Sequence, residues 1–511
     1  MARERVRWWH GALLGVVTGA VALGVAQLLA GLLDPTSAPI LTVGQAAIDA
    51  TPEWLKSWAI RSFGSADKAV LLGGMTVVIA AVAALLGILA IRHLGAAIAG
   101  LVALGAVGAA AAMSRPAAGP LAAVPAIGGT AAATFAVRRL RAALQGSPEA
   151  DPVDGATDED RRRFLLTVGG VLGAAVAAGG LGAVLGRRFR ADGSRAAIRI
   201  PTPDERVGPV PVTDPMVAGA STYLTPNDVF YRVDTALLVP SVTAEEWRLR
   251  VHGMVDREVD LTYADLLSMP LIERDVTLAC VSNEVGGDLV GNARWIGVRL
   301  RDVLDMAGVH PDADQLVSRS ADGWTCGTPT AIVMDGRDAM LAVSMNGEPL
   351  PVPHGFPVRM VVPGLYGYVS ATKWVVDLEL STFAAFDAYW IERGWAEQAP
   401  IKTQSRIDVP RDGATVDAGE VTVAGVAWAQ HTGIEEVEIG VDGGPWTPAT
   451  LADEATADTW RLWTFPWAAT SGDHMLSVRA TDRAGVTQTD VPAPPFPDGA
   501  AGHHTIAVTV R

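Results

Sequence analysis

The sequence is poor in cysteine and in charged residues. Its 511 residues include two cysteines, Cys280 and Cys326, too few for a disulfide scaffold, a zinc-finger framework, a cysteine-ligated iron–sulfur cluster or a CxxCH haem attachment. Only 19% of the residues are charged and half are hydrophobic, which excludes both a disordered chain and a wholly soluble one. A chain of this length is expected to form about three structural units.

The two parts of the chain carry opposite net charge. Residues 1–190 contain 17 Lys and Arg against 11 Asp and Glu, whereas residues 191–511 contain 23 against 44. Neither part has a basic stripe that would pair with phosphates, which argues against nucleic-acid binding. The chain therefore consists of a basic, apolar front part and an acidic back part.

Long uncharged segments occur only in the front part. Each is about as long as the stretch that crosses a bilayer, and residues 1–190 are accordingly predicted to form a membrane domain with five transmembrane helices. Most arginines of the front part lie on one side of the predicted spans: Arg3, Arg5 and Arg7 precede the first, Arg92 lies between the second and third, and Arg138, Arg139, Arg141, Arg161, Arg162 and Arg163 lie between the fourth and fifth. This pattern predicts a multi-pass protein of the cytoplasmic membrane with its back part outside the cytoplasm. The predicted spans are 8–33, 69–91, 94–114, 116–137 and 164–186.

The stretch before the last span has two interpretations. Arg161–Leu166, with the sequence RRRFLL, resembles the core of a twin-arginine export signal, which carries domains already folded around a cofactor. The same arginines also fit a positive-inside stop beside a membrane helix. Because His10 and His93 lie near the ends of predicted spans, we expect the bundle to act as an anchor and not to ligate haem.

The back part changes its pattern twice. Residues 191–220 are rich in Pro, Gly and Ala without a period and are predicted to be a linker. Between 221 and 400, strand signals such as Trp247–His252 mix with short helix signals such as Leu300–Ala307, which predicts an α+β domain. From 401 to 511, short strands separated by turns predict an antiparallel β-sandwich of the immunoglobulin type. Its tryptophans are expected in its core and interfaces: Trp428, Trp446, Trp460, Trp463 and Trp467.

Cys280 has two possible roles. It ends the apolar strand signal Val276–Cys280 and precedes a turn with two glycines, which would present a thiolate to a soft metal. A free cysteine is, however, more often a small buried hydrophobe. Cys326 has no motif beside it and is expected to pack in the core.

Three further segments carry polar groups suited to an anionic ligand. His354–Arg359 places an imidazole and a guanidinium close together. Gly367–Trp374 combines backbone N–H groups, hydroxyls and a lysine that together could bind a phosphate. Asn227–Arg232 adds an amide, a phenol and a guanidinium. Taken separately, each segment also fits an ordinary loop or a surface salt bridge.

Taken together, these segments resemble the sulfite oxidase family of molybdenum enzymes. The match runs in order along residues 221–405 and continues into the predicted sandwich. The motifs that carry it are Thr277–Cys280, Gly291–Val298, Met345–Pro351, His354–Arg359, Val361–Gly364 and Lys373-Trp374.

The resemblance implies a Mo-molybdopterin cofactor and a three-part fold. That fold is multidomain: a transmembrane helical bundle, an α+β sulfite-oxidase-type molybdopterin-binding domain at 221–400, and an immunoglobulin-like domain of the dimerisation type at 401–511. Cys280 would be the protein ligand of molybdenum and, with Arg232, a catalytic residue, since a thiolate suits a soft metal. The positions that match pterin- and phosphate-binding stretches are Asn227, Tyr231, Arg232, His354, Arg359, Ala371, Thr372 and Lys373.

The chain departs from the sulfite-oxidising members in the charge of the site. A basic stretch that follows their cysteine is replaced by Ser282–Val285, which contains Glu284, and their Arg-Asn-His becomes Arg232-Val233-Asp234. The tyrosine expected near the end of the domain falls on Trp395. Fewer positive charges disfavour a dianion such as sulfite. The sulfoxide-reducing branch tolerates a neutral substrate but lacks the sandwich, so the chain fits neither branch fully.

We therefore expect a membrane-anchored molybdopterin-dependent oxidoreductase that transfers an oxygen atom to or from a small S- or N-containing substrate outside the cytoplasm. The sequence has no flavin fingerprint or haem attachment, so electrons are expected to pass to a separate partner, a cytochrome or the quinone system. A homodimer is implied by resemblance alone. The alternatives are sulfite oxidase proper and a non-catalytic, membrane-tethered binding module.

Overall fold

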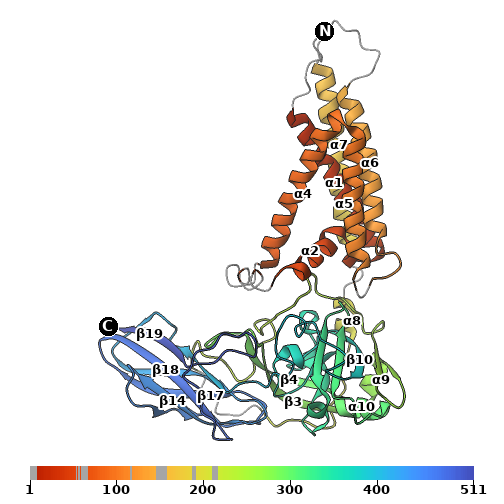
Figure 1. Ribbon diagram of the computed structural model, residues 1–511. Coiled ribbons are helices and arrows are strands. Elements are labelled where there is room, and N and C mark those ends of the chain that lie inside the picture. The colour runs from red at the N-terminus through yellow and green to blue at the C-terminus, as the bar shows by residue number, and fades with distance from the viewer. Residues whose placement is uncertain are drawn as a thin grey trace. The chain divides into compact units, whose positions relative to one another are not determined.

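A computed structural model describes residues 8–52, 55, 58, 67–115, 118–145, 158–186, 191–209 and 217–511. It has two compact units. The first comprises the chain up to Arg190 together with Ala236–Val239, and the second comprises Ala191–Thr235 and Pro240–Arg511. Figure 1 shows the first unit as long helices and the second as sheets with short helices.

Four helices in the described part of the first unit are long and apolar enough to cross a membrane: Trp8–Leu33, Val70–Arg92, Leu94–Met113 and Leu166–Gly186. They agree with four of the five predicted spans. Arg3, Arg5 and Arg7, on which the predicted orientation partly rests, lie outside the described residues. The helices of this unit are α1 (Trp8–Leu33), η1 (Pro35–Ser37), α2 (Pro39–Ala50), α4 (Asp67–Arg92), α5 (Leu94–Met113), α6 (Val124–Gln145) and α7 (Asp158–Gly186).

The span predicted at 116–137 is wrong in its position. The corresponding helix, α6, begins only at Val124, because a proline is tolerated in the first turn of a helix but not in its interior; Pro125 occupies that first turn. The helix then continues past the apolar segment through three arginines to Gln145 and is not among the four apolar helices. The number of crossings, and with it the side on which the second unit lies, stays a prediction.

α6 nevertheless packs along α1. If Gly129 carried a Cβ atom, that atom would lie only 2.5 Å from Ala22 O on α1, so the two backbones are in close contact there. Val137 and Leu140 of α6 share an apolar cluster with Leu14, which lies nearer the start of α1. The two helices are therefore antiparallel neighbours, and Figure 1 shows α6 alongside the other long helices.

Glycine allows α1 to approach α7 closely. A Cβ at Gly24 would lie 2.3 Å from Ala175 O, and a Cβ at Gly31 would lie 2.0 Å from Gly182 O. Small residues at such crossings let helix backbones pack directly against each other in a membrane. The backbone of Arg161–Leu166 forms part of the first turns of α7; its function as an export signal stays a prediction.

The linker prediction for residues 191–220 is wrong in its first part. Ala191 is fully buried in the core of the second unit, α8 (Asp192–Ala197) follows it, and Glu205 forms a bridge with Ile272. Arg195 donates hydrogen bonds to Leu350 O and to the carboxylate of Glu348. These tertiary contacts hold a segment whose composition alone predicts no regular structure. Residues 210–216 lie outside the described residues.

The next part of the second unit is a mixed α+β domain, as predicted, with two five-stranded sheets. The first sheet is antiparallel, with the order β3-β4-β7-β8 and β9 paired to β7. The second has the order β2-β1-β10-β5-β6, in which β1 and β10 are parallel. The strands are β1 (Arg248–Gly253), β2 (Val259–Thr262), β3 (Leu271–Ala279), β4 (Val290–Arg299), β5 (Gln315–Ser320), β6 (Thr325–Pro329), β7 (Met340–Met345), β8 (Glu348–Pro349), β9 (Arg359–Val361) and β10 (Val375–Ser381).

The short helices of this domain have clear sequence signals. Thr262 and Asp265 form a capping box at the start of α9 (Tyr263–Ser268), which satisfies free N–H groups of the first turn. Gly308, with a φ of 73°, ends α10 (Leu300–Ala307) in the left-handed conformation that glycine tolerates. The remaining short elements are α11 (Thr330–Met334), η4 (Val352–His354) and η5 (Gly367–Val369).

Residues past 401 form two further sheets that enclose an apolar core of their own, including Val423, Trp463 and Leu476. Pairing is antiparallel except that β12 is parallel to β19; the immunoglobulin-type arrangement stays a prediction. Trp463 and Trp467 are buried in this core, as predicted, while Trp428 and Trp460 join the core of the α+β domain. One sheet contains β11 (Gln404–Val409), β13 (Gly419–Trp428), β16 (Thr450–Leu451) and β17 (Arg461–Ala469), and the other β12 (Ala414–Val416), β14 (Ile434–Val441), β15 (Thr447–Pro448), β18 (Gly472–Asp482) and β19 (His504–Val510).

Candidate functional site

Cys280 is the first residue after β3, at the start of the loop to β4. Its N–H donates to Leu289 O at 2.9 Å, its carbonyl accepts from Asn283 N at 3.0 Å, and Leu289 N donates to Asn283 Oδ1 at 2.8 Å. Most residues of β3 and β4 are buried, which explains their long apolar sequences. The hydrogen-bonded hairpin of β3 and β4 therefore presents Cys280 at the end of its strand, and the thiol is neither disulfide-bonded nor fully covered.

The environment of Cys280 both hinders and helps thiolate formation. Burial raises the pKa of the Cys280 thiol, while the backbone N–H and hydroxyl of Ser282 and the charge of Lys373 oppose that rise. Desolvation disfavours a charged group, whereas donors and cations favour an anion. Since a metal ion stabilises a thiolate far more strongly than these groups, the residue is suited to act as a metal ligand.

Two tyrosines lie close to this thiol. Burial, and second the charge on Cys280, raise the pKa of Tyr231; burial likewise raises the pKa of Tyr366 to about 12, with Cys280 contributing. A Cβ built on Gly367 would lie 3.7 Å from both Ala279 O and Tyr231 Oη. The segments around positions 231, 280 and 367, far apart in the sequence, therefore meet here.

Arg359 is a buried cation with a free donor. Its guanidinium lies 4.9 Å from the centre of the Trp295 ring and donates through Nη1 to His354 O at 3.2 Å. Within the described structure, its Nε has no hydrogen-bond partner. Burial lowers the pKa of Arg359 to about 10. An uncompensated buried cation is costly, so an anionic ligand here would stabilise it.

His354 is neutral and fixed in orientation. Its Nε2 lies 3.0 Å from Asn227 O, and because a carbonyl can only accept, the ring proton is on Nε2. Burial lowers the pKa of His354 to about 4, and the neighbouring charge of Arg359 adds to the effect. The Phe230 ring packs edge-on against it at 5.7 Å.

Lys373 forms a buried ion pair with Asp234. Its ammonium also donates to Val233 O at 3.0 Å, and Arg232 Nε lies 2.8 Å from the other carboxylate oxygen of Asp234. Burial lowers the pKa of Lys373 to about 8, and Asp234 opposes that change. Two cations are thus compensated by one carboxylate at the site.

Some of the predicted cofactor-binding residues use their side chains elsewhere. The side-chain amide of Asn227 hydrogen-bonds Glu348 Oε1 at 2.6 Å and Asn346 at 2.9 Å. Asn227 therefore contacts the site through its backbone carbonyl, which binds His354. Thr372 Oγ1 lies 2.6 Å from Ser318 Oγ in the core. Ala371 lies beside Gly367. A role for Asn227, Ala371 or Thr372 in holding a cofactor stays a prediction.

Sequence reasoning missed several neighbours of the site. It treated Asp234 as a change in substrate charge and not as the partner of Lys373, which lies 139 residues later. It gave no role to Trp295 beyond a motif, or to Tyr366. It also missed Arg406, on β11, which donates to Gly287 O in the Cys280 loop at 2.6 Å. No local sequence signal identifies such long-range pairs.

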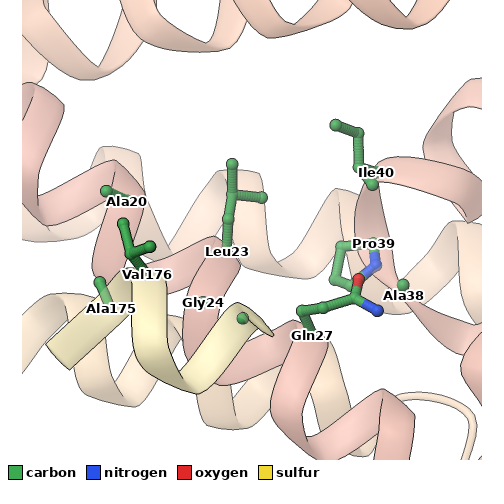
Figure 2. Close-up of a pocket in the computed structure, with 10 residues that line it drawn as sticks. Ala20, Leu23, Gly24, Gln27, Ala38, Pro39, Ile40, Ala175 and Val176 are labelled. Atoms are coloured by element: carbon green, nitrogen blue, oxygen red, sulfur yellow. The ribbon is translucent and has the colours of Figure 1, made fainter. Parts of the chain in front are cut away.

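Two cavities in the helical unit are lined by none of the residues of this site. A pocket of about 290 Å³ lies in the helical unit between α1, α2 and α7, and Figure 2 shows the amide of Gln27 as the polar side-chain group among apolar neighbours such as Leu23 and Val176. A lining of this kind suits an acyl chain or helix packing, and it contains no titratable side chain. It is separate from the chemistry around Cys280.

Comparison with known proteins identifies relatives over part of the chain. The family model "Oxidoreductase molybdopterin binding domain" matches residues 236–390. Sulfite oxidase of Gallus gallus is 31% identical over 326 residues, covering 54% of this chain and 70% of its own length. Human mitochondrial sulfite oxidase is 32% identical over 321 residues, with 53% of this chain and 58% of the human protein covered. This chain thus spans little more than half the length of its mammalian relatives.

A solved structure has the same fold. The crystal structure of the sulfane dehydrogenase SoxCD from Paracoccus pantotrophus matches with a TM-score of 0.50 and 24% identity, covering 56% of this chain and 81% of that one. "Uncharacterized oxidoreductase YuiH" of Bacillus subtilis is 33% identical over 150 residues, which are 29% of this chain and 72% of that protein.

Proposed function

The chain belongs to the sulfite oxidase family of molybdopterin-binding oxidoreductases, and we propose that it is a membrane-anchored enzyme that transfers an oxygen atom to or from a small S- or N-containing substrate outside the cytoplasm. The observation that carries the proposal is the convergence of the Cys280 thiol, the Arg359 guanidinium and the Lys373 ammonium. Among the described residues, Arg359 Nε has no hydrogen-bond partner. A soft ligand beside buried cations is what a metal bound to an anionic organic cofactor requires.

The residues present fit Mo-molybdopterin. Cys280 would hold the metal through its thiolate, and Arg359 and Lys373 would bind the anionic phosphate of the pterin. When bound, the cofactor supplies the two-electron chemistry of oxygen-atom transfer.

The protein's own side chains would bind and orient the cofactor and hold protons at defined atoms. Arg359 is held by Trp295 and by His354 O, so its free Nε is preorganised for an acceptor. His354 stays neutral near pH 7, since its pKa is about 4. Lys373 can gain or lose a proton at Nζ in the physiological range, since its pKa is about 8.

The charge of the site favours a neutral substrate over sulfite. Asp234 compensates Lys373 and Arg232, and Glu284 is exposed in the Cys280 loop. A dianion therefore meets less net positive charge than the number of cations suggests. Sulfite oxidase proper is the second candidate, favoured by the similarity to sulfite oxidases. A screen of the reconstituted protein with sulfite, methionine sulfoxide and other S- and N-oxides, with artificial electron donors and acceptors, separates the two.

Membrane attachment and location complete the proposal. Four apolar helices and the distribution of arginines support a cytoplasmic-membrane protein with an external second unit. In the same scheme, electrons would pass to a separate partner, a cytochrome or the quinone system, and residues 401–511 would form the interface of a homodimer. Vesicles of known orientation treated with protease test the location, because an external second unit is cleaved only from the outer side.

Replacing the thiol tests the enzyme assignment. Cys280→Ser should abolish oxygen transfer while leaving most pterin bound, because the phosphate contacts remain. Cys326→Ser is the matched control, since Cys326 is buried with its Sγ 3.8 Å from Thr328 Oγ1 and should retain activity. Purified wild-type protein should contain about one molybdenum per chain. Full turnover by Cys280→Ser, or wild-type protein without molybdenum from a pterin-competent host, would instead support a tethered binding module.

A further inference from the structure

The loop Cys280–Leu289 contacts the C-terminal sandwich near the end of the loop that leads into β4. The loop has few backbone hydrogen bonds of its own. Besides the bonds that link Cys280 with Leu289 and Asn283, Gly287 N donates to Glu284 O at 2.9 Å. Gly287 O accepts from Arg406 Nη1 at 2.6 Å, a charge-assisted bond. Thus a side chain of one domain holds the loop that carries the thiol of the other.

Arg406 is fully engaged and largely buried, with 11% of its side chain exposed. Its Nε donates to Asp408 Oδ1 at 2.6 Å and its Nη2 to Ser221 Oγ at 3.0 Å. Asp408 in turn accepts from Ser221 N at 2.9 Å. The guanidinium is therefore locked by a carboxylate on its own strand, and its planar fork directs Nη1 at the loop.

His504, on β19, contacts Gly286, the residue before Gly287 in the loop. A Cβ at Gly286 would lie 2.2 Å from His504 Cδ2, so the ring lies directly against this backbone, which only glycine permits. His504 Nδ1 accepts from Ile407 N at 3.0 Å, the residue after Arg406. Strands β11 and β19 thus hold neighbouring points of the loop.

The sandwich also holds the strand that leads into Cys280. Thr277 N donates to Asp458 O at 2.9 Å, its hydroxyl accepts from Trp460 N at 2.7 Å, and its carbonyl accepts from Gln430 Nε2 at 3.1 Å. Cys280 therefore lies between two points that the C-terminal domain fixes, Thr277 on one side and Gly287 on the other.

We propose that the C-terminal sandwich is part of the active-site architecture and that Arg406 is a positioning residue for Cys280. By holding Gly287 O, Arg406 sets the conformation of the loop Cys280–Leu289 and with it the presentation of the thiol. This inference assigns the sandwich a role within one chain, independent of dimerisation. Only its consequence for the metal rests on the proposed function.

The test begins with full-length protein free of cofactor. Arg406→Met keeps the length of the side chain but removes its donors, and should raise the alkylation rate of Cys280 by iodoacetamide about tenfold, the expected effect of losing one charge-assisted hydrogen bond. Cys326, fully buried, serves as the internal reference. Hydrogen exchange at the amides of Asn283, Gly287 and Leu289 should accelerate in parallel.

The matched control is Arg461→Met. Arg461 lies on β17 and donates to Ala452 O and Ile434 O, both at 2.8 Å and both within the sandwich. It should leave the Cys280 loop unchanged. Arg406→Lys keeps the charge with one donor group and should restore part of the wild-type rates; it also serves if Arg406→Met does not fold. Alkylation and exchange rates in Arg406→Met equal to those in Arg461→Met would overturn the proposal.

The reconstituted protein supplies a second readout. In Arg406→Met the thiolate-to-metal absorption band should shift and kcat should fall with little change in KM, because the loop alters the ligand and not substrate binding. An unshifted band would also overturn the proposal. If wild-type protein binds no molybdopterin, the proposed function fails, whereas the measurements on cofactor-free protein still decide the role of Arg406.

Discussion

The ion pair between Lys373 and Asp234 allows a quantitative prediction of how the pKa of Lys373 changes when Asp234 is replaced. In the folded protein the pKa of Lys373 is about 8, well below 10.5, although Asp234 raises it. Two unit charges about 4 Å apart interact by about 4 kcal/mol at an effective dielectric constant of ~20, which corresponds to about three pKa units. Asp234→Asn should therefore lower the pKa of Lys373 to between about 5 and 6. At pH 7 the side chain then becomes neutral and loses its attraction for a phosphate.

The small number of lysines in the chain makes the pKa of Lys373 simple to measure by NMR. The sequence contains four lysines, so Cε-labelled lysine gives few NMR signals, and each reports the protonation of its own Nζ. The matched control is Asp498→Asn, which removes the partner of Lys402 at 3.0 Å; that aspartate is 55% exposed. This second pair is screened by solvent and does not include Lys373, so Asp498→Asn should leave the Lys373 titration as in the wild type. A Lys373 titration midpoint that stays near 8 in Asp234→Asn would refute the electrostatic account of the site.

Two further predictions concern stability. His354 has a folded-state pKa of about 4 against 6.5 when unfolded, so the unfolded chain binds its proton first as pH falls, and the free energy of unfolding should drop by up to about 3 kcal/mol between pH 6.5 and 4. His354→Gln, which keeps a donor for Asn227 O, should remove this part of the pH dependence in urea titrations; an unchanged slope would assign it to other groups. Gly31→Leu should lower the thermal unfolding midpoint of the helical unit in detergent, because overpacking costs about 1–3 kcal/mol and a Cβ there meets Gly182 O. Gly180→Leu faces open space in the described structure and should be neutral; equal midpoints would disprove the close α1–α7 contact.

Much of the local structure was predictable from the sequence because its signals are local. Uncharged apolar runs identified four of the long helices, and a continuous apolar run predicted the strand that leads into Cys280. Two predictions from local composition were wrong, because tertiary contacts or a proline determined the structure there. The linker prediction failed because Ala191 and Glu205 pack on the α+β domain, and one predicted span failed because proline shifts the start of α6.

Some features of the site were likewise predictable from the sequence, and others only from the tertiary structure. The sequence by itself determined that a thiol follows a buried strand, that a histidine and an arginine lie five residues apart, and that a lysine ends a glycine-containing loop, because these are properties of neighbouring residues. Only the tertiary structure decided that Asp234 compensates Lys373, that Trp295 holds Arg359, and that the loop after Cys280 rests on Arg406. Each of those pairs joins segments far apart in the chain, and the folding of the whole domain, not any local preference, brings them together.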